Sequence, residues 1–122
     1  MTQLLHVLLV DAQAGVHESL EPRLKRTGYR TTLARDGVGA LETARRDPPD
    51  LIVLDGSAPG ENCQQTCREL KRLRPELPVI IYQGEGTANA ENDTTDCGAD
   101  ELVARPADPA LVMQKIVQLL HR

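Results

Sequence analysis

The sequence predicts an α/β domain in which helices cover both faces of a doubly wound parallel sheet. Two observations support this fold class. Short aliphatic runs alternate with stretches whose apolar residues recur at helical spacing, as in strands that alternate with amphipathic helices. The clearest runs are apolar at nearly every position, which is typical of parallel strands buried on both faces. The length of 122 residues fits one domain, residues 1–122.

Five aliphatic runs are candidates for the strands of this sheet. The first and third runs are the most continuous, and the second is short and polar enough for an edge strand. Pro78 opens the fourth run, where the loss of one backbone donor is tolerated. The expected strands are residues 4–10, 29–34, 51–54, 78–82 and 102–104.

Four stretches between and after these strands carry a helical pattern. Pro22 in the first would remove one helix hydrogen bond and could kink the helix. Asp108 before Pro109 predicts the N-cap of the last, with proline at the first helical position. The expected helices are residues 15–27, 38–47, 66–73 and 109–120.

Composition excludes several classes of function. The chain has no Trp or Phe and two Tyr, so it lacks the aromatic platforms on which single-stranded nucleic acids stack. Its net charge of −4 also disfavours a phosphate-backbone binder. No apolar run approaches a membrane span, and the first residues do not resemble a signal peptide. Three cysteines are too few for a disulfide framework, so we expect a cytoplasmic protein with reduced thiols.

Polar residues that directly follow the strands are the candidate functional residues, because ligands of doubly wound sheets bind at the carboxyl ends of the strands. These residues are Asp11, Asp55, Gln83 and Arg105. Asp11 and Asp55 follow strands that are neighbours in a sheet of order 2-1-3-4-5. Two such carboxylates suit a hard cation such as Mg²⁺, and a carboxylate is also a nucleophile toward a phosphoryl group. Alternatively, each Asp is only a turn former at a strand end.

Taken together, the strand ends resemble those of bacterial response-regulator receiver domains over nearly the whole chain. The matching stretches are 6–11 (HVLLVD), 34–37 (ARDG), 49–55 (PDLIVLD), Pro59-Gly60, 78–81 (PVII), 98–100 (GAD) and Arg105-Pro106. The resemblance implies a flavodoxin-like fold with five parallel strands in the order 2-1-3-4-5. It also implies a phosphoacceptor at Asp55 and a Mg²⁺ site at Asp11, Asp55 and Ser57, with no flavin or nucleotide.

Several positions depart from the family pattern. Ala12 stands where receivers usually have a second acid, Gln83 where they have Ser or Thr, and Leu102 where they have an aromatic switch residue. Arg105 replaces the usual Lys, a swap that adds a planar and bulkier head. We therefore expect a non-enzymatic, atypical receiver that binds a partner protein, with phosphorylation impaired or absent. The alternative is a competent receiver that takes phosphate from a histidine kinase on Asp55. A homodimer is a further alternative.

The segment 84–97 lacks large apolar residues, although receivers form their fourth helix there. Thr, Asn and Gly are poor helix formers, so we expect this helix to be short or irregular. From Gly84 to Glu101 the chain has six acidic residues and no Lys or Arg. This stretch is either an altered partner face or a solvated loop.

Other candidate sites have weaker support. Cys63 and Cys67 lie one helical turn apart and could share a soft metal, but buried thiols are the better interpretation. A dehalogenase-like phosphatase would need a second Asp where Ser57 stands, and a flavin carrier would need a phosphate cradle after Asp11. The histidines His6, His17 and His121 show no functional spacing. A basic patch around the end of the first helix is better interpreted as a solvated face than as a nucleic-acid footprint; its residues are Arg23, Lys25, Arg26 and Arg30.

Overall fold

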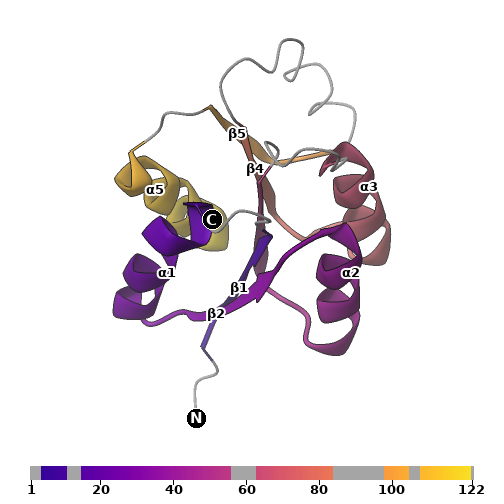
Figure 1. Ribbon diagram of the computed structural model, residues 1–122, viewed down its shortest axis with the longest axis horizontal. Helices are drawn as coiled ribbons and strands as arrows, with labels where there is room; N and C mark the ends of the chain where they lie inside the picture. The colour runs from indigo at the N-terminus through magenta and orange to yellow at the C-terminus, as the bar shows by residue number, and fades with distance from the viewer. Residues whose placement is uncertain (1–3, 11–14, 56–62, 84–97, 105–107, 122) are drawn as a thin grey trace.

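The computed structural model describes residues 4–10, 15–55, 63–83, 98–104 and 108–121 (Figure 1). Its centre is a five-stranded parallel sheet of order β2-β1-β3-β4-β5. This order confirms the doubly wound topology expected from the sequence. The strands are β1 (His6–Val10), β2 (Arg30–Ala34), β3 (Leu51–Asp55), β4 (Val79–Gln83) and β5 (Glu101–Ala104).

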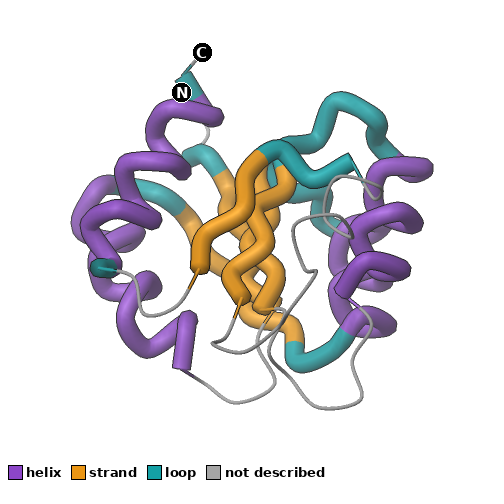
Figure 2. The backbone as a smooth tube through the Cα atoms, turned by 90° about the horizontal axis from the view of Figure 1, so that it is seen from above, coloured by secondary structure: helices purple, strands orange, loops and turns teal. Residues whose placement is uncertain are grey.

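Helices cover both faces of the sheet, as expected. Helices α1 and α5 pack on one face, and α2 and α3 pack on the other (Figures 1 and 2). The bounds are α1 (Gly15–Thr27), α2 (Gly37–Arg46), α3 (Cys63–Leu73) and α5 (Pro109–Leu120). The short or irregular fourth helix falls within residues 84–97 and so lies outside the described residues.

The sheet separates the core into two aliphatic layers because successive strand residues point to opposite faces. Leu8, Ile52 and Ile81 belong to the layer under α2 and α3. Leu9, Val53 and Ile80 belong to the layer under α1 and α5. All six side chains are fully buried, and burial of one such side chain stabilises the fold by about 1.5–3 kcal/mol. The central strands therefore form a rigid base for the residues at their ends.

The course and the carboxyl end of α1 follow from local chemistry. The helix continues through Pro22, so the proline expected to disturb it is accommodated within its length. Gly28 ends the helix with φ +102, a left-handed conformation that glycine adopts without strain. The Gly28 amide donates to Lys25 O at 3.1 Å, and the Tyr29 amide donates to Leu24 O at 3.0 Å. This Schellman-type turn leads directly into β2.

Strand β2 is an edge strand, as its polar sequence predicted. It pairs with β1 alone, in parallel, from His6↔Arg30 to Val10↔Ala34. Of its five residues only Ala34 is buried, whereas every residue of β1 is buried. The structure begins β1 at His6 rather than at residue 4, and Leu4 is exposed.

Candidate functional site

The carboxyl ends of four strands meet at one edge of the sheet. Val10, the last residue of β1, pairs with Leu54, and Asp55 follows as the last residue of β3. Asp55 pairs in turn with Tyr82 of β4, and Gln83 pairs with Ala104 of β5. We call this the acceptor edge, because the resemblance predicts the phosphoacceptor position there. The register thus brings together the ends of the strands that carry, or directly precede, the residues singled out from the sequence.

The predicted site residues differ in how far the structure describes them. Asp55 and Gln83 were expected directly after their strands; the structure includes them as the last residues of β3 and β4, and their backbone positions are described. Asp11, Ser57 and Arg105 lie outside the described residues. Among the described side chains, no group of three or more His, Cys, Asp or Glu residues is arranged to hold a metal ion. The Mg²⁺ site therefore stays a prediction.

Leu102 lies in the middle of β5 and pairs with Ile81. Its side chain is half-buried and packs against the core layer under α2 and α3. An aliphatic side chain in this position fills the core without a polar tip or a ring. Leu102, which the resemblance predicts to stand at the aromatic switch position, is therefore a packing residue in the described fold.

Two ion pairs fix the start of β5. Asp100 Oδ2 accepts from Lys71 Nζ of α3 at 2.8 Å and from the Val79 amide at 2.9 Å. The same ammonium donates to Leu77 O at 2.6 Å. From the other face of the sheet, Lys115 Nζ of α5 lies 2.7 Å from Glu101 Oε1. Strand β5, which carries Leu102, is thus anchored to a helix on each side. Sequence reasoning noticed the GAD stretch but not the lysine that pairs with it.

The remaining sequence candidates have ordinary structural roles where they are described. Cys67 is a fully buried thiol in the core, as the preferred interpretation held, and the side chain of Cys63 is not described. In the basic group, Lys25 pairs with Glu21 on α1 at 3.4 Å. Arg30 is bound to Asp47. None of the described helices has the length and apolar character of a membrane span.

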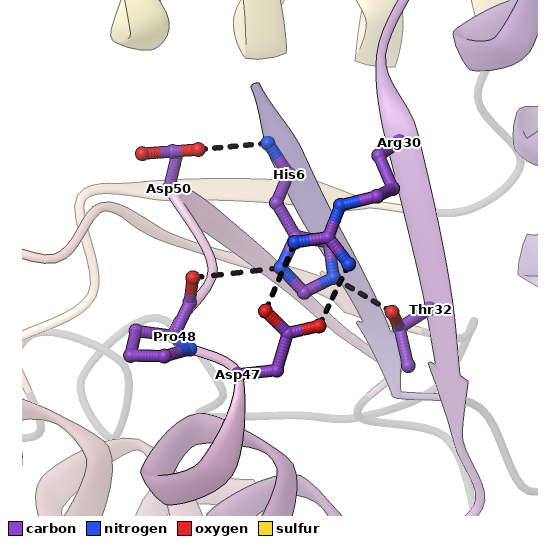
Figure 3. A network of polar contacts seen from close by, with 6 residues as sticks. All are labelled: His6, Arg30, Thr32, Asp47, Pro48 and Asp50. Atoms are coloured by element: carbon purple, nitrogen blue, oxygen red, sulfur yellow. Dashed lines mark hydrogen bonds and ion pairs between the residues drawn. The ribbon is translucent and has the colours of Figure 1, made fainter. Parts of the chain in front are cut away.

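A polar cluster that sequence reasoning missed lies at the opposite, amino edge of the sheet (Figure 3). Its centre is His6, which is 1% exposed. The bidentate pair of Arg30 and Asp47, with N–O distances of 2.7 and 2.9 Å, lies beside it. The hydrogen bonds from Arg30 lower the pKa of the Asp47 carboxyl. The partners come from separate parts of the chain, so no local spacing could have revealed the cluster.

Comparisons with known proteins show which family of domains this chain is similar to. The family model described as "Response regulator receiver domain" matches residues 7–117. The response regulator MprA of Mycobacterium leprae is 34% identical over 118 residues, which are 97% of this chain and 52% of that protein. MprA of Mycobacterium ulcerans is 33% identical, and the match covers 95% of this chain and 50% of that one. The chain thus spans about half the length of the curated relatives it matches.

Solved structures of the same kind superpose over nearly the whole chain. A putative response regulator from Chloroflexus aurantiacus has a TM-score of 0.88 at 26% identity, over 98% of this chain and 100% of that one. The signal receiver domain of a signal transduction histidine kinase from Syntrophus aciditrophicus has a TM-score of 0.84 at 27% identity, over 94% and 89% of the two chains.

Proposed function

Because this chain belongs to the response-regulator receiver domain family, we propose that it is an atypical receiver: a signalling and protein-interaction module in which phosphorylation of Asp55 is impaired or absent. The family places the chain in two-component signal transduction. We further propose that the whole protein acts in the cytoplasm, where it binds a partner protein or a histidine kinase.

The observation that carries the proposal is the position of Gln83. It is the last residue of β4, next in sequence to Tyr82, which pairs with Asp55. Receivers resembling this chain usually have a Ser or Thr there, whose small hydroxyl moves toward the phosphoryl group. Gln is longer, and its terminal amide has a different shape and donor geometry. A phosphoryl group on Asp55 would therefore meet an altered neighbour on the adjacent strand.

The other departures act in the same direction. Ala12 removes one carboxylate from the predicted Mg²⁺ site, and Arg105 replaces a compact ammonium by a planar guanidinium. Leu102 is packed against the core in the described fold. An aliphatic side chain there offers no aromatic ring to reorient in response to phosphorylation. Each change weakens a separate part of the phosphorylation switch.

Asp11, Asp55 and Ser57 are the residues that would hold Mg²⁺. The fit rests on Asp55, whose strand end adjoins the end of β1 directly before Asp11. Two carboxylates suit the oxygen preference of Mg²⁺, but the missing third acid lowers the expected affinity. When bound, the cation would offset the negative charge of an incoming phosphoryl group.

The competing function is a phosphorylation-competent receiver. In that case a carboxylate oxygen of Asp55 attacks the phosphorus atom of the donor, the bond from phosphorus to the leaving group breaks, and an aspartyl phosphate forms. The end position of Asp55 on a buried strand favours this alternative. It would make Gln83 and Arg105 residues that tune the rate rather than residues that abolish the reaction.

Intact-mass measurement of the protein with acetyl phosphate and Mg²⁺ separates the two functions. The control variant is Asp55→Asn, which keeps the shape of the side chain but removes the nucleophilic charge. We expect no gain of one phosphoryl group, or a substoichiometric gain, in a protein whose circular dichroism shows that it is folded. Rapid stoichiometric labelling that the Asp55→Asn variant loses would overturn the proposal and establish the competent receiver.

A partner protein is the expected ligand of such a module. The acidic stretch between Gly84 and Glu101 is the proposed partner face, and a homodimer is the alternative. Light scattering across a concentration series distinguishes these outcomes, because only self-association raises the mass of the isolated protein with concentration.

A further inference from the structure

We propose that the His6 cluster, formed by His6, Arg30, Thr32, Asp47, Pro48 and Asp50, is a pH-sensitive joint that loosens the amino end of edge strand β2 when the imidazole takes up a proton. Figure 3 shows the cluster. His6 and Arg30 are the first residues of β1 and β2, so the cluster lies at the end of the sheet opposite to the acceptor edge. The proposal therefore stands independently of whether Asp55 is phosphorylated.

The backbone of His6 is fixed on the side of β3. Its amide donates to Asp50 Oδ2 at 2.7 Å, and its carbonyl accepts from the Asp50 amide at 2.7 Å. This reciprocal pair does not involve the ring. A change in the ring's protonation therefore acts on its other neighbours, Thr32 on β2 and Pro48 in the α2–β3 connection.

The ring contacts favour one tautomer of the neutral imidazole. Nδ1 lies 3.5 Å from Pro48 O, and a carbonyl oxygen only accepts, so we assign the proton of the neutral ring to this nitrogen. Nε2 lies 2.7 Å from Thr32 Oγ1 and accepts from that hydroxyl. The neutral ring is thus satisfied at both nitrogens, between β2 and the end of α2.

Proton uptake reverses one of these bonds. The proton arriving from water binds the lone pair of Nε2, which then becomes a donor. Thr32 Oγ1 must turn from donor to acceptor, and its own hydrogen loses its partner. The ring also acquires a positive charge at a site that is 1% exposed, where a charge is costly unless it is paired.

The charged groups around the ring come from each neighbouring element. Arg30 on β2 opposes a positive ring, whereas Asp47 at the end of α2 and Asp50 before β3 favour it. Arg74, which directly follows α3, donates to Pro49 O at 3.2 Å and adds positive charge next to the α2–β3 connection. Asp47 is already engaged by the two hydrogen bonds from Arg30. Asp47 therefore does not offer the ring an unengaged counter-charge, and Asp50 Oδ2 already accepts from the His6 amide.

The net effect favours the neutral ring. Burial lowers the pKa of His6 below its ordinary value of 6.5, Arg30 lowers it further, and the Pro48 carbonyl and the two carboxylates offset only part of this. Between the folded and unfolded pKa values the unfolded chain binds more protons. The contribution of the neutral His6 ring to the free energy of unfolding is therefore complete above about pH 6.5, and it is lost as the pH falls toward the folded pKa.

Denaturant unfolding between about pH 7.5 and about pH 5 tests the proposal in the wild type, His6→Gln and the control His121→Gln. In the wild type we expect the unfolding equilibrium constant to rise below about pH 6.5, by up to about tenfold per pH unit for one proton. His121→Gln should keep this dependence, because His121 lies at the end of α5, where its ring contacts Tyr29 and not the His6 cluster. His6→Gln should lose most of it. Equal pH dependence in His6→Gln and wild type would overturn the proposal.

A second measurement does not require the His6→Gln variant to fold. In a His17→Gln/His121→Gln background, His6 is the sole imidazole and its NMR titration is unambiguous. We expect a midpoint below that of a histidine in an unfolded peptide. Amide exchange, corrected for intrinsic rates, should show β2 losing protection relative to β3 as the pH falls. A midpoint at or above the peptide value, or an unchanged ratio of β2 to β3 protection, would contradict the proposal.

Discussion

Lys71 and Asp100 form a half-buried ion pair at 2.8 Å that joins the end of α3 to the start of β5. Their side chains are 18% and 20% exposed, so water screens the pair only in part. The lysine also binds Leu77 O, and the aspartate also binds the Val79 amide. Both ends of the pair thus hold the backbone that leads into β4, and the pair connects α3, β4 and β5.

Replacing Lys71 by Met is therefore expected to destabilise the fold by about 1–3 kcal/mol, because it leaves Asp100 half-buried without its counter-charge. Urea unfolding measures the change. The matched control is Lys25→Met, which removes the exposed pair with Glu21 and should change stability by less than about 0.5 kcal/mol. Equal effects of the two variants would mean that the Lys71 pair contributes no more than an ordinary surface pair.

Gly37 is expected to be intolerant of a side chain. A Cβ atom at this position would collide with Oγ1 of Thr66, a buried residue of α3. Gly37→Ala should cost about 1–3 kcal/mol by overpacking, although alanine favours helices. Thr66→Ala removes the obstructing hydroxyl, so the double variant should recover part of the loss. A double-mutant cycle measured by urea unfolding would show no coupling energy if the contact between α2 and α3 were looser than described.

Replacing the two charged neighbours of His6, Arg30 and Asp47, should shift the pKa of His6 in opposite directions. Arg30→Gln should raise the pKa of His6, since the guanidinium lowers it, and Asp47→Asn should lower that pKa further, since the carboxylate raises it. Arg30→Gln should also return the pKa of Asp47 upward toward its ordinary value. NMR titration of the imidazole and carboxyl resonances measures all three shifts. Shifts of His6 in the same direction in both variants would exclude this electrostatic assignment.

Restoring the family's residues at the acceptor edge should restore phosphorylation. Ala12→Asp, Gln83→Thr and Arg105→Lys are expected to raise labelling of Asp55 by acetyl phosphate, and the triple variant by about tenfold or more, because each adds or reshapes a charge or hydrogen-bond contact at the reacting group. Intact mass over time gives the rates. Adding Asp55→Asn to the triple variant is the control and should abolish labelling. A wild type that labels as fast as the triple variant would show that the departures have no effect on the reaction.

Most of the fold could be predicted from the sequence because its signals are local. The continuous aliphatic runs predicted β1, β3 and β4, and the polar composition of residues 29–34 predicted an edge strand. The start of β1 was predicted too early, since Leu4 and Leu5 continue the apolar run but the pairing with β2 begins at His6. Pattern alone does not show where the partner strand begins.

The candidate site was only partly predictable, for the same physical reason. Asp55 and Gln83 could be placed at strand ends because the register of parallel strands is set by their buried residues. The contacts of His6 and the Lys71–Asp100 pair could not be predicted. The hydrogen-bond partners of His6 are 26 to 44 residues away in the chain, and Asp100 is 29 residues from Lys71. Such contacts depend on tertiary packing and leave no spacing in the sequence.

The division of the core into two layers has a spectroscopic consequence. The chain has no Trp, and its two tyrosines, Tyr29 and Tyr82, both contact the layer under α1 and α5. Tyrosine emission during unfolding therefore reports most directly on that side of the sheet. Cys67 is buried in the opposite layer, so in a Cys63→Ser/Cys97→Ser background the rate of its thiol labelling gives a complementary signal. Together the two probes would reveal whether the halves of the domain melt as one cooperative unit.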